Sequence, residues 1–278
     1  MSWDPSQLDS PPPAEMPPPP PPVQRPQHPL RRLFAPFAGA ALLVWKLLGP
    51  LLIAVKNVKL LGASVTFLIS LAAYTSIWGW HFAVGFMVLL FVHEMGHVIQ
   101  LRREGVPASA PMFVPFMGAF VGMKELPRNA WMEAKVGLAG PVLGTAGALV
   151  CLGAAMATDS NLLRAVAYTG CFLNLINLIP VLPLDGGRAA AAFHPAFWFV
   201  GVFVVALLFF WHPNALILII ALLGGYELFH RWGHRNDPKW REYNAVTWGQ
   251  RVAVGAVYLG LIAVLVAAMQ ASYLHRTF

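Results

Sequence analysis

Charged residues are scarce in this sequence, so few side chains are available to form a water-exposed surface. Only 11% of the 278 residues are Asp, Glu, Lys or Arg, whereas 58% are hydrophobic. A soluble domain of this length cannot bury so much apolar surface in one core, so a lipid bilayer must act as part of the solvent. The composition excludes an ordinary soluble protein and predicts a polytopic membrane protein.

Cysteine is also rare, and no dense basic surface is present. Cys151 and Cys171 lie in apolar runs, where a thiol usually behaves as a small hydrophobic side chain. A disulfide framework is therefore not expected. The net charge is +7, but Lys and Arg lie between apolar blocks and are not interleaved with aromatic residues on one surface. We expect no nucleic-acid partner.

Proline density and hydropathy divide the chain into four expected regions. Residues 1–33 hold half of the 24 prolines, which predicts a disordered tail that is locally polyproline II, without a cleaved secretory signal. Residues 34–59 are broken by Lys, Gly and Pro, which is typical of an interfacial or partly inserted helix. Residues 60–190 form the expected transmembrane core. Residues 191–278 are expected to form C-terminal transmembrane helices with a basic cytoplasmic loop.

Apolar blocks of membrane-spanning character recur from residue 60 onward. The expected spans are 60–78, 81–101, 136–157, 162–183, 196–211, 214–230 and 250–272. Two of them are short, because about 20 residues are normally needed to cross a bilayer, and such helices must tilt or thin it. The predicted fold class is an all-α polytopic membrane protein with about six to seven transmembrane helices.

The positions of Lys and Arg predict the orientation. If the loops at 101–135, 184–195 and 231–249 are cytoplasmic together with the N-terminal tail, nearly every Lys and Arg lies on that side. The same arrangement brings His97 and Asp185 near one membrane face. We expect a multi-pass protein of the cell membrane whose tail and site opening face the cytoplasm.

The motif His93-Glu94-Met95-Gly96-His97 indicates a metal site. A spacing of four residues in a helix puts both imidazoles on one face, one turn apart, as two zinc ligands require. Glu94 lies about 100° around the helix, so it suits a general base better than a ligand. The alternative is a pair of histidines hydrogen-bonded to neighbours. It is disfavoured because charged groups inside a bilayer cost about 2.5–3.5 kcal/mol each and are functional by default.

Asp185 is the best candidate for the third protein ligand that a catalytic zinc needs. The prolines of the segment 177–187 end or unwind the preceding helix, and its glycine pair permits a turn that can aim the carboxylate back at the metal. The alternative role is a helix cap or turn residue. Glu227 has no such turn and is expected to pair with Arg231 at i+4.

Together, the two motifs resemble those of the site-2 protease family of intramembrane metallopeptidases, which are His-Glu-x-x-His and a later Asn-x-x-Pro-x-x-Pro-x-Asp-Gly-Gly-like stretch. The resemblance covers roughly residues 60–190, which are thereby expected to be the catalytic core. It implies that His93, His97 and Asp185 hold one Zn2+ per chain and that Glu94 is the catalytic base.

Residues 140–144 match the Gly-Pro element of that family on the intervening helix. The sequence departs from the family at Gly144, where many members have Asn, so polar help from this position is absent. Small residues at 137, 140, 144 and 147 still allow close helix packing.

Two asparagines are candidate oxyanion or substrate contacts. Asn174 and Asn177 lie about one turn apart on the helix that leads to Asp185, so either can donate a hydrogen bond to an oxyanion. An Asn near a kinked helix end is equally often present to satisfy freed backbone groups.

The apolar, proline-broken stretch 110–123 is a candidate substrate contact of another kind. It is predicted to be a short, β-like membrane-dipping strand or hairpin, in which Gly118, Ala119 and Val121 can pair with an extended substrate. The resemblance agrees, because family members place such a loop between the two motif helices. The alternative is a hydrophobic loop that only covers the site.

The predicted function is hydrolysis of peptide bonds in or near transmembrane segments of membrane protein substrates, with a zinc-activated water and Glu94 as general base. A zinc transporter or metal-binding membrane protein is the first alternative, but the blocks 60–78, 136–157 and 196–230 hold almost no ionisable residues for a path. A catalytically silent scaffold would not need Glu94. A membrane-anchored protease with a soluble catalytic lobe would need a larger polar region.

Overall fold

A computed structural model describes residues 59–115, 118–122, 125, 127–193, 196–234 and 236–273. All of them belong to one compact unit that runs from residue 54 to residue 278. The predicted Pro-rich tail lies outside the described residues, and so does the predicted interfacial helix, except for its last residue.

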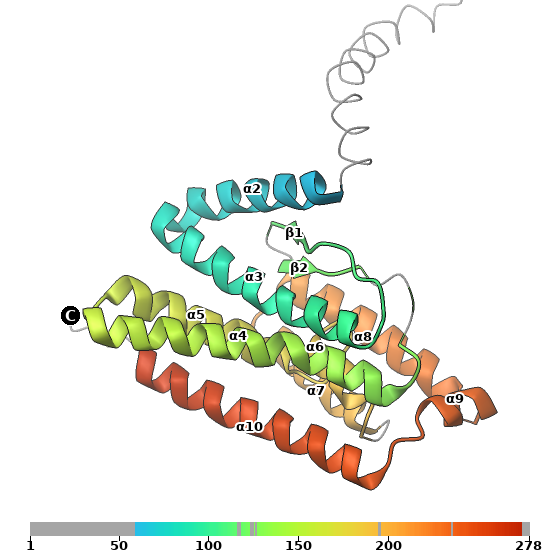
Figure 1. Cartoon of the computed structure of the whole chain (residues 1–278). Coiled ribbons are helices and arrows are strands. Elements are labelled where there is room, and N and C mark those ends of the chain that lie inside the picture. The colour runs from blue at the N-terminus through green and yellow to red at the C-terminus, as the bar shows by residue number, and fades with distance from the viewer. Residues whose placement is uncertain are drawn as a thin grey trace, which may run out of the picture. The chain divides into compact units, whose positions relative to one another are not determined.

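The described residues are mostly helical, with one small hairpin (Figure 1). The helices are α2 (Lys59–Trp78), α3 (Trp80–Arg103), α4 (Ala130–Thr158), α5 (Asn161–Asn177), α6 (Asp185–Ala190), α7 (Ala196–Trp211), α8 (Ala215–Gly233), α9 (Pro238–Tyr243) and α10 (Trp248–Ser272). The strands are β1 (Met112–Val114) and β2 (Gly118–Phe120). The predicted predominance of helix and the predicted strand-like segment are confirmed.

Four of these helices, α3, α4, α8 and α10, are long and apolar enough to cross a membrane. Residues 62–78 of α2 and the whole of α7 are shorter apolar helices. The predicted total of six to seven spans stays a prediction.

Capping side chains and prolines set the ends of the motif-bearing helices. α4 begins six residues before the predicted span, because the Asn129 side chain accepts a hydrogen bond from the Met132 amide at 2.9 Å. α5 begins after Ser160, whose hydroxyl accepts from the Leu163 amide. It ends at Asn177, short of the predicted residue 183, because Pro180 and Pro183 cannot continue the helix.

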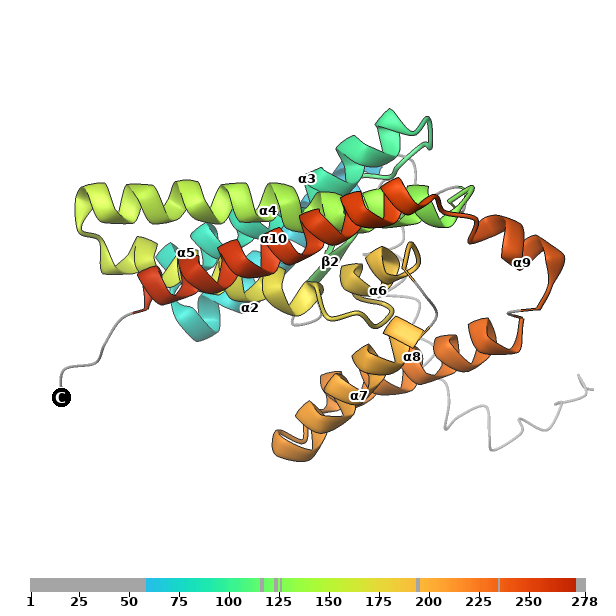
Figure 2. The ribbon, with the colours of Figure 1, turned by 90° about the horizontal axis from the view of Figure 1, so that it is seen from below.

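α4 lies at the centre of the motif-bearing helices and contacts α3, α5, α6 and α10. Figure 2 shows α10 running along α4 and α5, with α7 and α8 paired beside each other. Glycines on α3 and α4 let these two helices approach closely. A Cβ on Gly96 would overlap the main-chain oxygen of Ala139 and lie 2.7 Å from its carbonyl carbon. The expected close packing through small residues of α4 is confirmed.

The hairpin packs between α2 and α3. β1 contacts α2, β2 contacts α3, and the strands pair antiparallel with Phe113 opposite Ala119. The Phe113 amide donates to the Thr66 hydroxyl of α2 at 3.3 Å. The hairpin is therefore attached to α2 along the outer edge of β1.

A buried charge network joins α4, α8 and α9. Arg231 donates to Glu227 at 2.7 Å and to Glu133 at 3.1 Å, so the predicted Glu227–Arg231 pair is confirmed. Tyr243 donates to the second Glu133 oxygen at 2.7 Å. Burial, together with the Glu133 carboxylate, raises the pKa of the Tyr243 phenol above its ordinary range, so the hydroxyl remains a donor at neutral pH.

The contact between α3 and α4 generates a stability prediction. Gly96→Ala is expected to lower the thermal midpoint, because the new methyl group must push apart two backbones, at a cost of about 1–3 kcal/mol. Gly153→Ala on α4 is the control, since nothing lies within 4 Å of its Cβ position. The measurement is thermal loss of helical circular dichroism in detergent. Equal midpoints for the two variants would contradict the close α3–α4 contact.

Candidate metal centre

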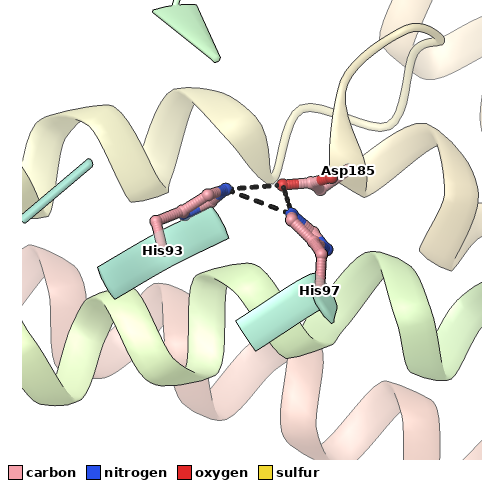
Figure 3. Close-up of side chains that lie close together, drawn as sticks. All are labelled: His93, His97 and Asp185. Atoms are coloured by element: carbon pink, nitrogen blue, oxygen red, sulfur yellow. Dashed lines mark hydrogen bonds and ion pairs between the residues drawn. The ribbon is translucent and has the colours of Figure 1, made fainter. Parts of the chain in front are cut away.

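Three side chains from two distant segments converge beside α4 (Figure 3). The His93 and His97 Nε2 atoms, both from α3, lie 3.3 Å apart. One Asp185 oxygen, from the start of α6, lies 3.0 Å from the first and 3.2 Å from the second. Both histidines are buried and the Asp185 side chain is only 12% exposed. The structure thus brings together the three residues that the motifs predicted as ligands.

The other ring nitrogen of each histidine is held by an acceptor. His93 Nδ1 lies 2.8 Å from the Asn174 side-chain oxygen, and His97 Nδ1 lies 2.8 Å from the main-chain oxygen of Val136. Amide oxygens can only accept, so each Nδ1 carries the hydrogen. In a neutral imidazole, each Nε2 is then left as an electron-pair donor toward the centre.

With both imidazoles neutral, the centre consists of two imidazole lone pairs and a carboxylate oxygen facing one another. Three such acceptors within 3.3 Å repel one another unless they share a cation. Tetrahedral zinc with bonds of about 2.0–2.1 Å needs neighbouring ligand atoms about 3.3 Å apart. Two histidines and one carboxylate are also a known ligand set of catalytic zinc, which keeps a fourth position open. The residues present fit zinc in spacing and in chemistry.

Glycines of α4 make room for this arrangement. A Cβ on Gly140 would overlap His97 Nε2 and lie 2.8 Å from His93 Nε2, so any side chain here would fill the space beside both nitrogens. A Cβ on Gly144 would overlap the Asn174 amide in the same way. Residue 144 itself offers no polar group, as the sequence predicted. Asn174 of α5 occupies that volume and contacts His93.

The segment that carries Asp185 is attached to the neighbouring helix α7. Asp185 is the first residue of α6 and Leu184 occupies the N-cap position, so the Asp185 carboxylate points to the histidines and does not cap the helix. Trp198 of α7 donates its indole N–H to the Gly187 carbonyl at 2.8 Å. The Arg231 guanidinium lies 4.6 Å from the centroid of the same ring, which connects the Asp185 turn to the buried charge network.

Glu94 lies beside the metal centre without joining it. Its side chain is buried and forms no hydrogen bond to another described residue. It is within electrostatic range of the two histidines, Asp185 and Arg188. A buried carboxylate placed in this way is available to accept a proton.

The other predicted contact residues are distributed around the centre. Both atoms of the Asn174 amide are engaged, because its nitrogen donates to the Gly170 carbonyl at 2.7 Å. Asn177 is half-buried and its side chain forms no hydrogen bond to another described residue. Gly118 and Ala119 lie in β2, and Val121 follows it. Substrate contact by these residues stays a prediction.

Two contributors to the centre have no signal in the local sequence. The Val136 carbonyl belongs to the main chain, so residue type does not reveal it. Trp198 reaches the Asp185 turn from α7, and an aromatic residue in an apolar helix is typical of any membrane span.

The fold and centre define a class: helical membrane proteins with a buried His–His–Asp site next to a glutamate. A model of peptidase family M50 matches residues 81–160, which include both histidines, Glu94 and all of α4. A zinc metalloprotease of Methanocaldococcus jannaschii is 33% identical over 114 residues, 38% of this chain and 33% of that protein.

Rip3 of Mycobacterium tuberculosis, which carries a provisional zinc metalloprotease designation, is 31% identical over 121 residues, 40% of this chain and 30% of that protein. The matches thus cover about a third of the length of these relatives. They confirm the resemblance to the site-2 protease family that the two motifs predicted.

The contact between Asn174 and His93 generates a prediction about metal affinity. Asn174→Ala is expected to weaken zinc binding about 10–100-fold, because His93 Nδ1 loses the acceptor that sets its orientation and tautomer. Asn177→Ala, one turn along the same helix, is the control and is expected to bind zinc like the wild type. Competition with a chromophoric chelator in detergent measures both. Equal affinities in the two variants would remove Asn174 from this role.

Proposed function

We propose that this protein is an intramembrane zinc metalloprotease that hydrolyses peptide bonds in or near transmembrane segments of membrane proteins. The observation that carries the proposal is the convergence of two imidazole lone pairs and the Asp185 carboxylate, with Glu94 unengaged beside them. The M50 match and the names of the two relatives support it.

In the proposed mechanism, His93, His97 and Asp185 hold one Zn2+. Bound zinc would polarise the scissile carbonyl and lower the pKa of a bound water toward 7. The hydrogen bonds to Asn174 and Val136 keep both Nε2 atoms directed at the metal. The negative Asp185 carboxylate offsets part of the metal charge.

Glu94 is the proposed general base. Its carboxylate takes a proton from the attacking water and then delivers it to the leaving amine nitrogen as the C–N bond breaks. We assign the oxyanion contact to Asn177, because the Asn174 amide already serves His93 and Gly170.

Substrate recognition is proposed to occur at the free edge of β2. In an antiparallel pair, opposed residues alternate between hydrogen-bonded and non-hydrogen-bonded. Phe113 donates outward to Thr66, so Phe113 and Ala119 form a non-hydrogen-bonded pair. The Ala119 amide and carbonyl therefore point away from β1, where an extended peptide can pair with them. Val121 has the same parity, whereas Gly118 pairs with Val114.

The proposed orientation puts the loops beside both motifs on the cytoplasmic side. Arg102 and Arg103 end α3, while Lys135 lies in the second turn of α4 and Arg251 in the first turn of α10. α4 and α10 both begin at the end of the bundle where α3 finishes (Figure 2). Basic residues gathered at one end of a helix bundle favour the cytoplasmic face.

The proposed chemistry predicts that metal content and activity will separate among variants. His93→Ala, His97→Ala and Asp185→Ala should each lower zinc content, because one of three ligands is lost. Glu94→Gln should retain zinc while cleavage falls about 10²–10⁴-fold, because only the base is removed. Zinc is measured by elemental analysis, and cleavage by new N-termini of a transmembrane substrate in liposomes. Wild-type cleavage by Glu94→Gln, or full zinc retention by Asp185→Ala, would contradict the assignments.

The proposed strand pairing predicts a separate effect at Ala119. Ala119→Pro removes the outward amide donor while the β1–β2 ladder bonds remain, so turnover should fall severely with zinc content unchanged. Ala119→Ser keeps the donor and should cleave like the wild type. The same substrate assay measures both variants. Equal cleavage by the two would exclude pairing at this residue while leaving the zinc chemistry intact.

A further inference from the structure

An open groove lies between the end of α3, the first half of α4 and the first half of α10, and none of the residues proposed to act in catalysis lines it. Its volume is about 370 Å³ and its walls are mostly apolar. Ile99, Val142 and Val257 are among its lining residues. Gly96 also lines it, so the groove reaches the rear of the helix that carries both histidines.

The groove changes from polar to apolar along its length. Arg103, Lys135 and Trp131 line it near the helix ends. Farther along α4, the lining residues up to Leu143 are apolar. From residue 131 to residue 143, α4 advances about 18 Å, which is close to the depth of one leaflet of a hydrocarbon core of about 30 Å. The groove therefore has the polarity and length of a single lipid with its headgroup at the interface.

The two cations at the mouth of the groove differ in their partners. Lys135 forms an ion pair with Glu104 at 2.5 Å, and Gln100 donates to the same Glu104 oxygen at 2.6 Å. Lys135 also lies over the Trp131 ring, 5.3 Å from its centroid. The Arg103 side chain is exposed and has no hydrogen bond or ion pair with another described residue. The mouth thus presents one guanidinium whose charge no described acid offsets.

We propose that this groove binds one anionic phospholipid, with the phosphate at Arg103 and an acyl chain along α4 and α10. A guanidinium can contact a phosphate with two parallel hydrogen bonds, and basic pockets between transmembrane helices suit anionic headgroups. The proposal is independent of the proteolytic activity proposed above.

The test is a lipid titration of the purified full-length protein in detergent, followed by native mass spectrometry. The probes are phosphatidylglycerol and phosphatidylcholine with identical acyl chains. The wild type is expected to prefer phosphatidylglycerol, and Arg103→Gln is expected to lose about fivefold of that preference. Arg102→Gln is the matched control, because the neighbouring exposed arginine does not line the groove. It is expected to keep the preference.

One further variant and one soluble competitor test whether the acyl chain of the lipid is bound in the groove. Val142→Trp should weaken binding of both lipids, because the exposed Val142 side chain lines the groove and an indole would fill it. Glycerol phosphate without acyl chains should not compete. Equal losses in Arg103→Gln and Arg102→Gln would show attraction by net charge alone and would overturn the proposal. Wild-type indifference to headgroup, unchanged binding by Val142→Trp, or full competition by glycerol phosphate would also overturn it.

Discussion

Mutual repulsion of three electron-pair donors is the constraint on which the rest of the structure depends. Two imidazole nitrogens and a carboxylate oxygen lie within 3.3 Å of one another in the interior of the protein. Such a set is stable only around a cation, and it requires α4 to pass without a side chain at Gly140. The close α3–α4 packing, the unwound end of α5 and the Asp185 turn all serve that single convergence.

The metal centre could be predicted from the sequence where its logic is local. The i, i+4 histidines and the proline–glycine segment before Asp185 identify the three convergent side chains, because helix geometry and backbone restriction act over a few residues. The partners of the Nδ1 atoms could not be predicted, since a Val136 carbonyl has no residue signature. The relation of Asn174 to Gly144 requires the packing of two helices, and no pattern along one segment contains it.

The fold was predictable in kind and less so in detail. Apolar content and prolines indicate a strand-like segment after α3, but only the Phe113–Thr66 contact reveals which edge of the hairpin is attached to α2. The Glu227–Arg231 pair follows from helix spacing, whereas the bonds that Glu133 accepts from Arg231 and from Tyr243 depend on contacts across about a hundred residues. Long-range contacts of this kind extend support from the Asp185 turn to α9.

X-ray absorption spectroscopy of the zinc-loaded wild-type protein is the decisive measurement of the metal centre, because it reports the atoms bound to the metal. We expect only nitrogen and oxygen neighbours at about 2.0–2.1 Å, with outer-shell scattering from two imidazole rings. A sulfur neighbour at about 2.3 Å would mean that a cysteine binds the metal. That result, or scattering from one imidazole alone, would contradict the His93–His97–Asp185 centre.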